Sequence, residues 1–480
     1  MPITHHINTA ISLASGNSAS ANFGVQMVVA AHSVNSNRIN GPYSSLTAVA
    51  DAGFTLAAEP AIYGWAVSVF SPRPRVSQVR IGLIDTGENI PTALAAIDAA
   101  DPASHYARTL LTRTTADAMA LATSTEPTAK IAGAQSSDAN LLAGNASTAQ
   151  VSTLTVGGTA TDGTYSASLV NDWTGAVIGT GTVVRSTTPA TNDDLATALA
   201  AALEAIPAIA AITSPIASAT NTVPVTFDGL GNHYSWVIAA PAPGTVVAAD
   251  TAGQVQNAGA LMEAAGFVRT WLIYHDDDTE YLDAGWMSRC LSFNLDAPSG
   301  AGTWSYHRLA GLSGTSLTDA QKSALTAVNC NWYSPVKYTS GVEEAAFTFP
   351  GTMASGRFID ITTTIDLTQA RLEEAGMGVF LLAASRNAKV PFTDDGYAMF
   401  DAAFSDVCQK LVKAAHYAKD ATSPVSGEIT PKVTVPLVSS LSSAEKALRR
   451  GTMSIELVLA GAINSVGDTA TVGLAVTVNL

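Results

Sequence analysis

Charged residues are scarce in this sequence. Only 13% of the 480 residues are Asp, Glu, Lys or Arg, which is about half the usual share of a soluble protein. The 24 basic residues are outnumbered by 39 acidic ones, so the formal net charge is −15. Nucleic-acid binding depends on clustered Lys and Arg that displace counterions from phosphates, and no dense basic run occurs here. We therefore expect no direct nucleic-acid binding, and a sparsely charged surface that favours protein partners.

Long uninterrupted apolar runs are also lacking, although the mean hydropathy is +0.22. A membrane-spanning helix needs about 20 predominantly apolar residues, and the alanine-rich run 195–211 is interrupted by Glu204 and Pro207. We therefore expect no membrane insertion. Residues 1–6 lack a charged region followed by an apolar one, so secretion through the usual signal is not expected.

Cysteine and metal-binding motifs are few. The three cysteines, Cys290, Cys330 and Cys408, are an odd number and form no C-x-x-C pair, which is typical of reduced core residues in a cytoplasm. The sequence contains no H-E-x-x-H and no Gly followed by Lys, so neither a zinc-hydrolase site nor a phosphate-binding P-loop is expected. No cofactor is predicted.

The length predicts roughly two to four domains, and the hydrophobic share of 47% is ample for their cores. Between residues 71 and 137, short apolar runs alternate with stretches of helical period, a pattern typical of parallel strands joined by helical crossovers. The expected elements are strands at 76–84, 107–111 and 129–134 and helices at 92–100 and 115–123.

The composition changes between residues 139 and 253, which are rich in Thr, Ala, Gly and Ser. Short β-like pieces surround one alanine-rich helix expected at 192–205, so this region is predicted to be an inserted α+β domain. Turn signals at 157–158, 162–163 and 228–229 predict hairpins within it.

The earlier alternation resumes after the insertion, with a buried strand expected at 269–274 and a helix at 281–293. Thr318 and Gln321 have the spacing of a capping box, which marks another helix start. A longer helix is expected at 398–415. The predicted fold is therefore multidomain, α/β plus α+β: an α/β domain of residues 23–138 and 254–350, the inserted domain 139–253, and a C-terminal α+β domain of residues 351–467.

Both ends of the chain have the period of a β-strand. The apolar residues near the C-terminus occupy every second position: Val472, Leu474, Val476, Val478 and Leu480. At the other end, Ile3, Ile7, Ile11 and Leu13 fall on one parity. We predict two extended arms, residues 1–22 and 468–480, each ending in a strand.

Two interpretations of these terminal strands remain open. Each strand can pair within its own domain, as many chain ends do. Alternatively, each can be donated to a neighbouring copy, because residues 14–22 form a small polar linker that could carry a strand away from its own domain. A strand added at a sheet edge gains backbone hydrogen bonds and side-chain pockets.

Two clusters suggest chemistry only weakly. Ser443 and Lys446 match S-x-x-K, in which a lysine amine can activate a serine nucleophile, but the companion S-D-N and K-T-G motifs are absent; a helix N-cap at Ser442 or Ser443 explains the residues better. The acidic run Asp276-Asp277-Asp278, with Glu280 and Asp283, lacks the spacing of a calcium loop. We interpret this run as a solvated turn and helix start, and expect no enzyme.

The few basic groups of note could make contacts between subunits, where charge specifies register. The residues predicted for this role are Arg73, Arg75, Arg449 and Arg450, with Arg80 and Lys446 nearby. Scattered solvated side chains are the alternative.

Several sequence pieces between residues 254 and 467 occur in the order of one known family. Trp304 precedes Leu309-Ala310-Gly311-Leu312, and 329–333 fit an N-x-N-x-Y turn. Residues 351–360 fit a G…G-x-F-I-D element, and 389–396 resemble K-I-P-Y-T-D-x-G. In these pieces the chain resembles the contractile tail sheath proteins of myovirus-type bacteriophages, in the branch long catalogued as a domain of unknown function. Asn464 stands where the family's G-A-I-H element has histidine, and the inserted domain carries none of the family's motifs.

The resemblance implies a structural subunit of a phage tail, assembled in the host cytoplasm and found in the virion. Its partners would be other copies of itself in sixfold rings stacked helically, the tail tube protein, and the baseplate and tail terminator proteins. Residues 3–13 and 472–480 would be the donated strands. The recipient strand would lie at 452–459, where alternate residues are apolar: Met453, Ile455, Leu457 and Leu459.

In such a sheath, contraction drives the tube through the host envelope without a nucleotide, because assembly traps a higher-energy packing. Segments 15–17 and 467–468 would act as hinges. A surface-layer or adhesin-like lattice protein is the alternative function, which the low charge favours and the missing secretion signal disfavours.

Overall fold

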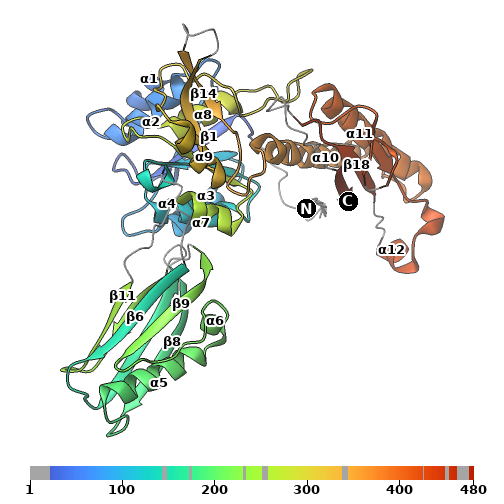
Figure 1. Ribbon diagram of the computed structural model, residues 1–480. Helices are drawn as coiled ribbons and strands as arrows, with labels where there is room; N and C mark the ends of the chain where they lie inside the picture. The colour runs from blue at the N-terminus through green and yellow to red at the C-terminus, as the bar shows by residue number, and fades with distance from the viewer. Residues whose placement is uncertain are drawn as a thin grey trace.

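A computed structural model of the chain describes residues 22–142, 149–171, 176–230, 234–250, 258–337, 344–424, 426–448, 453–461 and 475–479. Figure 1 shows these residues in three lobes: an α/β domain, the inserted domain beneath it, and a C-terminal domain that α10 connects to the α/β domain. The fold is therefore mixed α and β, with one large mixed sheet and several small sheets.

The α/β domain is built on an eight-stranded sheet in the order β14-β13-β12-β5-β4-β1-β3-β2. The inner strands of this sheet pair in parallel, as the alternation of strands and helices predicts; they are β13, β12, β5, β4, β1 and β3. The edge strands β2 and β14 pair antiparallel with their neighbours. The strand bounds are β1 Val25–Ala30, β2 Ile39–Tyr43, β3 Gln78–Leu83, β4 Ala107–Leu110, β5 Ile131–Ser136, β12 Thr270–Tyr274, β13 Asn331–Lys337 and β14 Glu344–Phe349.

Helices cover both faces of this sheet, which explains why its central strands are buried along their whole length. Side chains of α2 and α8 share one hydrophobic core with the sheet, and those of α3, α4, α7 and α9 form the cores on the opposite face. The helix bounds are α1 Leu46–Asp51, α2 Pro60–Phe70, α3 Ile90–Ala100, α4 Thr115–Thr125, α7 Ala258–Ala265, α8 Leu282–Leu291 and α9 Asp319–Ala327, with a 3-10 turn at Ala139–Leu141. The predicted capping box of Thr318 and Gln321 is present at the start of α9.

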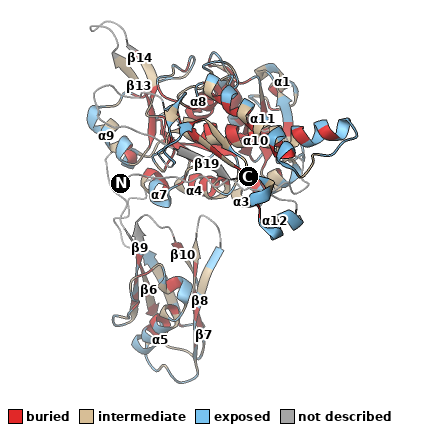
Figure 2. Ribbon diagram, turned by 90° about the vertical axis from the view of Figure 1, so that its right-hand side faces the viewer, coloured by how far each residue is buried: buried red, intermediate tan, exposed pale blue. Residues whose placement is uncertain are grey.

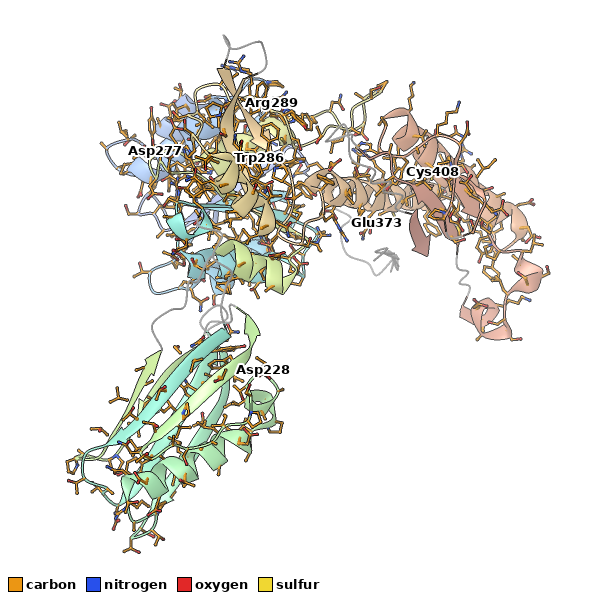
Figure 3. All side chains as sticks on the ribbon, in the orientation of Figure 1. Asp228, Asp277, Trp286, Arg289, Glu373 and Cys408 are labelled. Carbon is orange, nitrogen blue, oxygen red and sulfur yellow. The ribbon has the colours of Figure 1, made fainter. Side chains whose placement is uncertain are left out.

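Three tryptophans fill the centre of the core between the sheet and α8 (Figure 3 labels Trp286). The ring centroid of Trp271 lies 4.6 Å from that of Trp286 and 6.0 Å from that of Trp304. Gly133 is the register partner of Trp271 on the adjacent strand β5. A Cβ at Gly133 would lie 2.4 Å from the indole of Trp271, so only glycine leaves room for this ring.

The inserted domain has two three-stranded antiparallel sheets, β10-β7-β8 and β11-β6-β9, which share a hydrophobic core with the amphipathic helix α5. Its bounds are β6 Ala149–Gly157, β7 Gly163–Asn171, β8 Ala176–Arg185, α5 Asn192–Glu204, α6 Pro207–Ala210, β9 Thr222–Leu230, β10 Tyr234–Ala239 and β11 Thr245–Asp250. A capping box of Thr191 and Asp194 begins α5.

None of the three turn signals forms the hairpin predicted for it. The turn signals at 157–158 and 162–163 flank the connection from β6 to β7, but these strands belong to different sheets, because β6 pairs with β9 and β11 instead. Asp228-Gly229 lies within strand β9. The signals at 157–158 and 162–163 mark a change of chain direction without choosing the pairing partner, whereas the signal at 228–229 marks no turn.

The C-terminal domain packs two long helices, α10 Ile359–Ser385 and α11 Asp394–Lys413, against a small sheet in the order β17-β18-β19. The remaining elements are β15 Ala421–Thr422, β16 Ile429–Thr430, β17 Lys432–Thr434, a 3-10 turn at Val438–Ser440, α12 Ser443–Leu448, β18 Ser454–Val458 and β19 Ala475–Asn479. Figure 2 shows buried residues along one side of α10 and α11, whereas α12 is largely exposed.

Cys290, Cys330 and Cys408 are buried free thiols, and Figure 3 labels Cys408 on α11. Burial raises the pKa of the Cys408 thiol to about 12, so this thiol is an inert core group. Among the helices of the described ranges, none combines the length and the apolar character that a membrane crossing would require.

We expect Gly133→Ala to destabilise the α/β domain by about 1–3 kcal/mol, because the added methyl group must displace the Trp271 indole from a filled core. Gly378→Ala is the matched control, since a Cβ at this position on α10 meets nothing within 4 Å and alanine favours helix by about 1 kcal/mol over glycine. Urea denaturation followed by tryptophan fluorescence measures both. Equal stability of the two variants would contradict the packing account.

Candidate assembly site

Strand β18 is the central strand of the C-terminal sheet and has the alternation that the sequence predicts. Ile455 and Leu457 are fully buried, and Met453 and Leu459 are nearly so. All four belong to the core that includes Phe404, Val407 and Leu411 of α11. The burial of one face fixes the register of this strand, because a one-residue slip would turn its apolar residues outward.

Strand β19, the last described element, pairs antiparallel with β18 of its own chain. Val476 is the register partner of Leu457, and Val478 is the partner of Ile455. In the single chain, the predicted donor and the predicted recipient are thus partners of each other, which is the first of the two interpretations. Donation to a neighbouring copy stays a prediction. Ile3, Ile7, Ile11, Val472 and Leu474 lie outside the described residues.

The basic groups predicted to contact other subunits have different surroundings. Arg73 is exposed. The Arg75 guanidinium lies over the Phe70 ring, 5.0 Å from its centroid, and donates to the Phe70 carbonyl at the end of α2. Burial, followed by the neighbouring Arg73, lowers the pKa of Arg75. Arg75 therefore closes a helix end in its own domain, and Arg449 and Arg450 lie outside the described residues.

Ser443 and Lys446 are not joined to each other in α12. The Ser442 hydroxyl caps this helix by accepting from the Glu445 N–H at 3.2 Å, and Glu445 Oε2 accepts from the Ser442 N–H at 2.8 Å. Lys446 Nζ donates to the Ser439 carbonyl at 3.3 Å. The residues around the S-x-x-K match therefore form a helix cap, with Ser442 as the capping residue.

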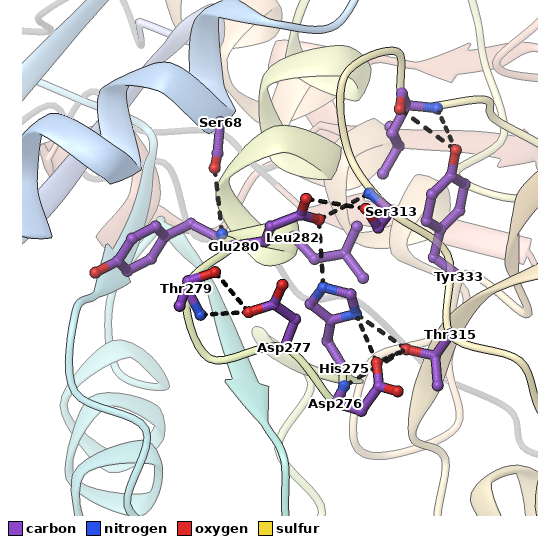
Figure 4. A network of polar contacts seen from close by, with 12 residues as sticks. Ser68, His275, Asp276, Asp277, Thr279, Glu280, Leu282, Ser313, Thr315 and Tyr333 are labelled. Atoms are coloured by element: carbon purple, nitrogen blue, oxygen red, sulfur yellow. Dashed lines mark hydrogen bonds and ion pairs between the residues drawn. The ribbon is translucent and has the colours of Figure 1, made fainter.

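The acidic run after β12 forms a turn whose carboxylates are held by neighbouring side chains, as Figure 4 shows. Thr315 Oγ1 donates to Asp276 Oδ1 at 2.6 Å and lies 3.0 Å from His275 Nδ1. Glu280 accepts from Ser313 N at 2.7 Å and lies 3.4 Å from His275 Nε2. The sequence prediction did not include His275 or Thr315, which join this turn to the loop before α9.

Asp277 and Asp278 have structural partners too, whereas Asp283 is set apart by its burial. Asp277 Oδ1 accepts from the N–H and hydroxyl of Thr279, and Asp278 pairs with Arg113 at 3.2 Å. Asp283 is buried in the first turn of α8, and this burial raises its pKa to about 6. No cluster of three potential ligands suited to a metal occurs among the described residues. The acidic run therefore forms the turn between β12 and the first turn of α8.

A buried ion pair, which the sequence prediction missed, connects the α/β domain to the C-terminal domain. Arg269, beside β12, donates through Nη1 and Nη2 to the two carboxylate oxygens of Asp366 on α10, at 2.9 and 2.8 Å. Their side chains are 18% and 4% exposed. The Tyr106 hydroxyl donates to the same carboxylate at 2.7 Å. We call this contact the Asp366 junction.

A second, exposed ion pair crosses the same domain boundary. Arg371 on α10 donates to Asp296, which follows α8, at 3.0 and 2.6 Å. Their side chains are 30% and 56% exposed. Exposed pairs contribute at most about 1 kcal/mol, so the Asp366 junction is the stronger constraint on how the two domains are oriented.

No model of a known protein family matches the chain, and no curated protein matches it. The assignment of a function therefore depends on the residues and contacts described above.

We expect Asp366→Asn to destabilise the chain by up to about 3 kcal/mol, because the substitution leaves the largely buried Arg269 guanidinium without its bidentate carboxylate partner. Asp296→Asn is the matched control at the exposed pair and should cost less than about 1 kcal/mol. Urea denaturation at constant pH gives both values. If the two substitutions cost the same, the Asp366 junction does not hold the domains together.

Proposed function

We propose that the chain is a structural subunit of a bacteriophage contractile tail sheath that polymerises around a tail tube by exchanging terminal strands between copies. Contraction of the polymer would then drive the tube through the host envelope. The observation that carries this proposal is the β18–β19 ladder, in which the end of the chain supplies the third strand of a sheet. The order of family-like sequence pieces in residues 254–467 supports the same function.

The ladder is suited to exchange because the contacts that hold β19 do not depend on which copy provides it. The ladder pairs Ser454–Val458 with Ala475–Asn479 along their full length. Residues 459–474 connect the two strands, and an extended connection of this length could reach roughly 50 Å at about 3.3 Å per residue. A neighbouring copy can therefore supply the same strand at little cost in free energy, as in domain swapping.

The Asp366 junction lies within one subunit, which is consistent with a lattice whose subunits move relative to one another as rigid bodies. The bidentate pair of Arg269 and Asp366 fixes α10 on the α/β domain within one subunit. Rearrangement between an extended and a contracted sheath would then take place at the connections between subunits, while each subunit moves as a body. Packed interfaces change between discrete arrangements, so a few kcal/mol per copy, switched cooperatively, would drive contraction.

Cysteine cross-linking tests strand exchange directly. Glu456 and Thr477 are register partners, and paired positions of antiparallel strands lie within disulfide range. We expect a mixture of Glu456→Cys chains and Thr477→Cys chains to form disulfide-linked dimers on assembly, because only exchange brings the two cysteines together. Non-reducing electrophoresis measures the dimers, and the buried native thiols should give little background.

A mixture of Glu456→Cys chains with Asp193→Cys chains is the control for random collision, since Asp193 lies on the exposed start of α5. The double variant Glu456→Cys/Thr477→Cys reports pairing within a chain. If only the double variant forms the disulfide, and it does so without dimers even in assembled material, strand exchange is wrong.

Removal of residues 472–480 or of residues 1–13 should leave a folded chain that no longer forms polymers, because the lattice loses its shared strands. Negative-stain electron microscopy of the purified proteins would reveal tubes or rings for the full chain and separate particles for both truncations. Tubes formed by both truncated chains would refute the proposed assembly mechanism.

A further inference from the structure

A cavity of about 300 Å³ lies where the α/β domain meets the C-terminal domain, and it is partly open to solvent. Trp304 lines it from the α/β domain, and Asp360 and His416 line it from the C-terminal domain. Phe23 and residues 459–461 border it as well. Residues at the start of the described chain and residues that directly follow β18 therefore meet at this cavity.

The walls of the cavity are largely aromatic and aliphatic. Phe23, Tyr106, Phe293 and Trp304 contribute rings, and the ring centroids of Phe23 and Tyr106 lie 4.7 Å apart. The face of an aromatic ring carries partial negative charge and attracts a cation within about 6 Å. An apolar ligand with a positive group therefore fits these walls better than an anion does.

Asp360, in the first turn of α10, is the acidic group in the lining. No side chain of the described residues forms an ion pair or hydrogen bond with its carboxylate, and the backbone N–H groups of Asp360 and Ile361 are its polar neighbours. Burial raises the pKa of Asp360 to about 6, so the carboxylate is ionised near pH 7.5. It is a partly buried negative charge, and no charged group contributes to the shift of its pKa.

The other titratable groups of the lining are neutral at this pH. The Tyr106 hydroxyl donates a hydrogen bond to Asp366, and burial raises the pKa values of Tyr106 and of the Cys290 thiol well above their usual values. His416 Nε2 donates to the Leu295 carbonyl at 2.8 Å, and its Nδ1 lies 3.0 Å from the Thr364 hydroxyl. Because both ring nitrogens are engaged and burial lowers the pKa of His416, Asp360 provides the one charge among the described lining residues.

We propose that this cavity binds a small organic cation, an ammonium or guanidinium group on a short apolar stem, with the charge on the Asp360 carboxylate and the stem against the aromatic rings. The volume is at the low end for ligand cavities, which favours an amine of a few carbons. A single carboxylate is too few ligands for a metal ion. The cation can be a free amine or the lysine or arginine side chain of another copy, and the proposal does not depend on the proposed sheath function.

Titration of the full chain with n-butylamine near pH 7.5, followed by tryptophan fluorescence and calorimetry, tests this proposal. We expect saturable binding, with n-butanol, the neutral analogue of similar size, at least about tenfold weaker because it lacks the charge-assisted contact. The substitution Asp360→Asn should weaken the binding of n-butylamine by a similar factor. Asp296→Asn, which removes an exposed carboxylate at the same domain boundary, should leave the affinity unchanged.

A pH series on the unaltered chain checks the result without a substitution. Affinity for n-butylamine should fall as the pH is lowered from 7.5 to 5, because Asp360 gains a proton while the amine keeps its charge. Equal affinities for n-butylamine and n-butanol, absence of n-butylamine binding, or an unchanged affinity in Asp360→Asn would each overturn the proposal.

Nα-acetyl-lysine amide distinguishes the two sources of the cation. Competition between this compound and n-butylamine would assign the site to a side chain of another copy. Binding of n-butylamine without competition would assign it to a free amine.

Discussion

The bidentate contact between Arg269 and Asp366 is the constraint on which the arrangement of the two larger domains depends. It holds the first half of α10 against the end of the parallel sheet, and the Tyr106 hydroxyl adds a third hydrogen bond to the same carboxylate. Burial, followed by the charge of Asp366, keeps the pKa of Tyr106 well above its usual value, so the phenol remains a donor over the physiological range. The cavity beside Asp360 and the sheet that carries β18 both take their positions from this helix.

The inserted domain is independent of that constraint. Its core contains residues of β6–β11 and α5–α6, together with the connection that follows α6, and none from the other two domains. Its chain begins after residue 142 and returns before residue 258, on the side of the α/β domain where α4 and α7 contact each other. A unit with its own core and two adjacent connections can change its outer surface without altering the parallel sheet, since stability effects at distant sites are nearly additive.

Local patterns predicted most of the elements, because burial of one face imposes a period on the sequence. The parallel strands β3, β4, β5 and β12 and the alternation of β18 follow from such periods, and the capping-box spacing gave the cap at Thr318. The first half of α10, which is rich in Ile and Thr, has the composition of a strand. This segment is helical because tertiary packing overrides a weak local propensity, and the sequence prediction missed the helix.

The contacts that decide the domain arrangement were beyond sequence reasoning for a different reason. Tyr106 and Asp366 are 260 residues apart, and Arg269 and Asp366 are 97 apart, so no local period relates them. The pairing of β19 is likewise a matter of which edge the strand reaches, and alternation specifies a strand without specifying its partner. The sequence therefore indicated β18 and β19, the described strands of the candidate assembly site, and left open whether they are joined within one chain or between two.

The scarcity of charge becomes informative once the positions of the charges are known. Arg108, whose side chain is fully buried, and Lys130 share the carboxylate of Asp98 at 3.2 and 2.6 Å, inside the α/β domain. Asp366 and Arg269 are likewise used within the subunit. Charges used in the interior cannot specify neighbours, and charged residues make up only 13% of the chain. The lattice that we propose would need another source of specificity, and backbone ladders between strands would supply it through register and side-chain pockets instead of through ion pairs.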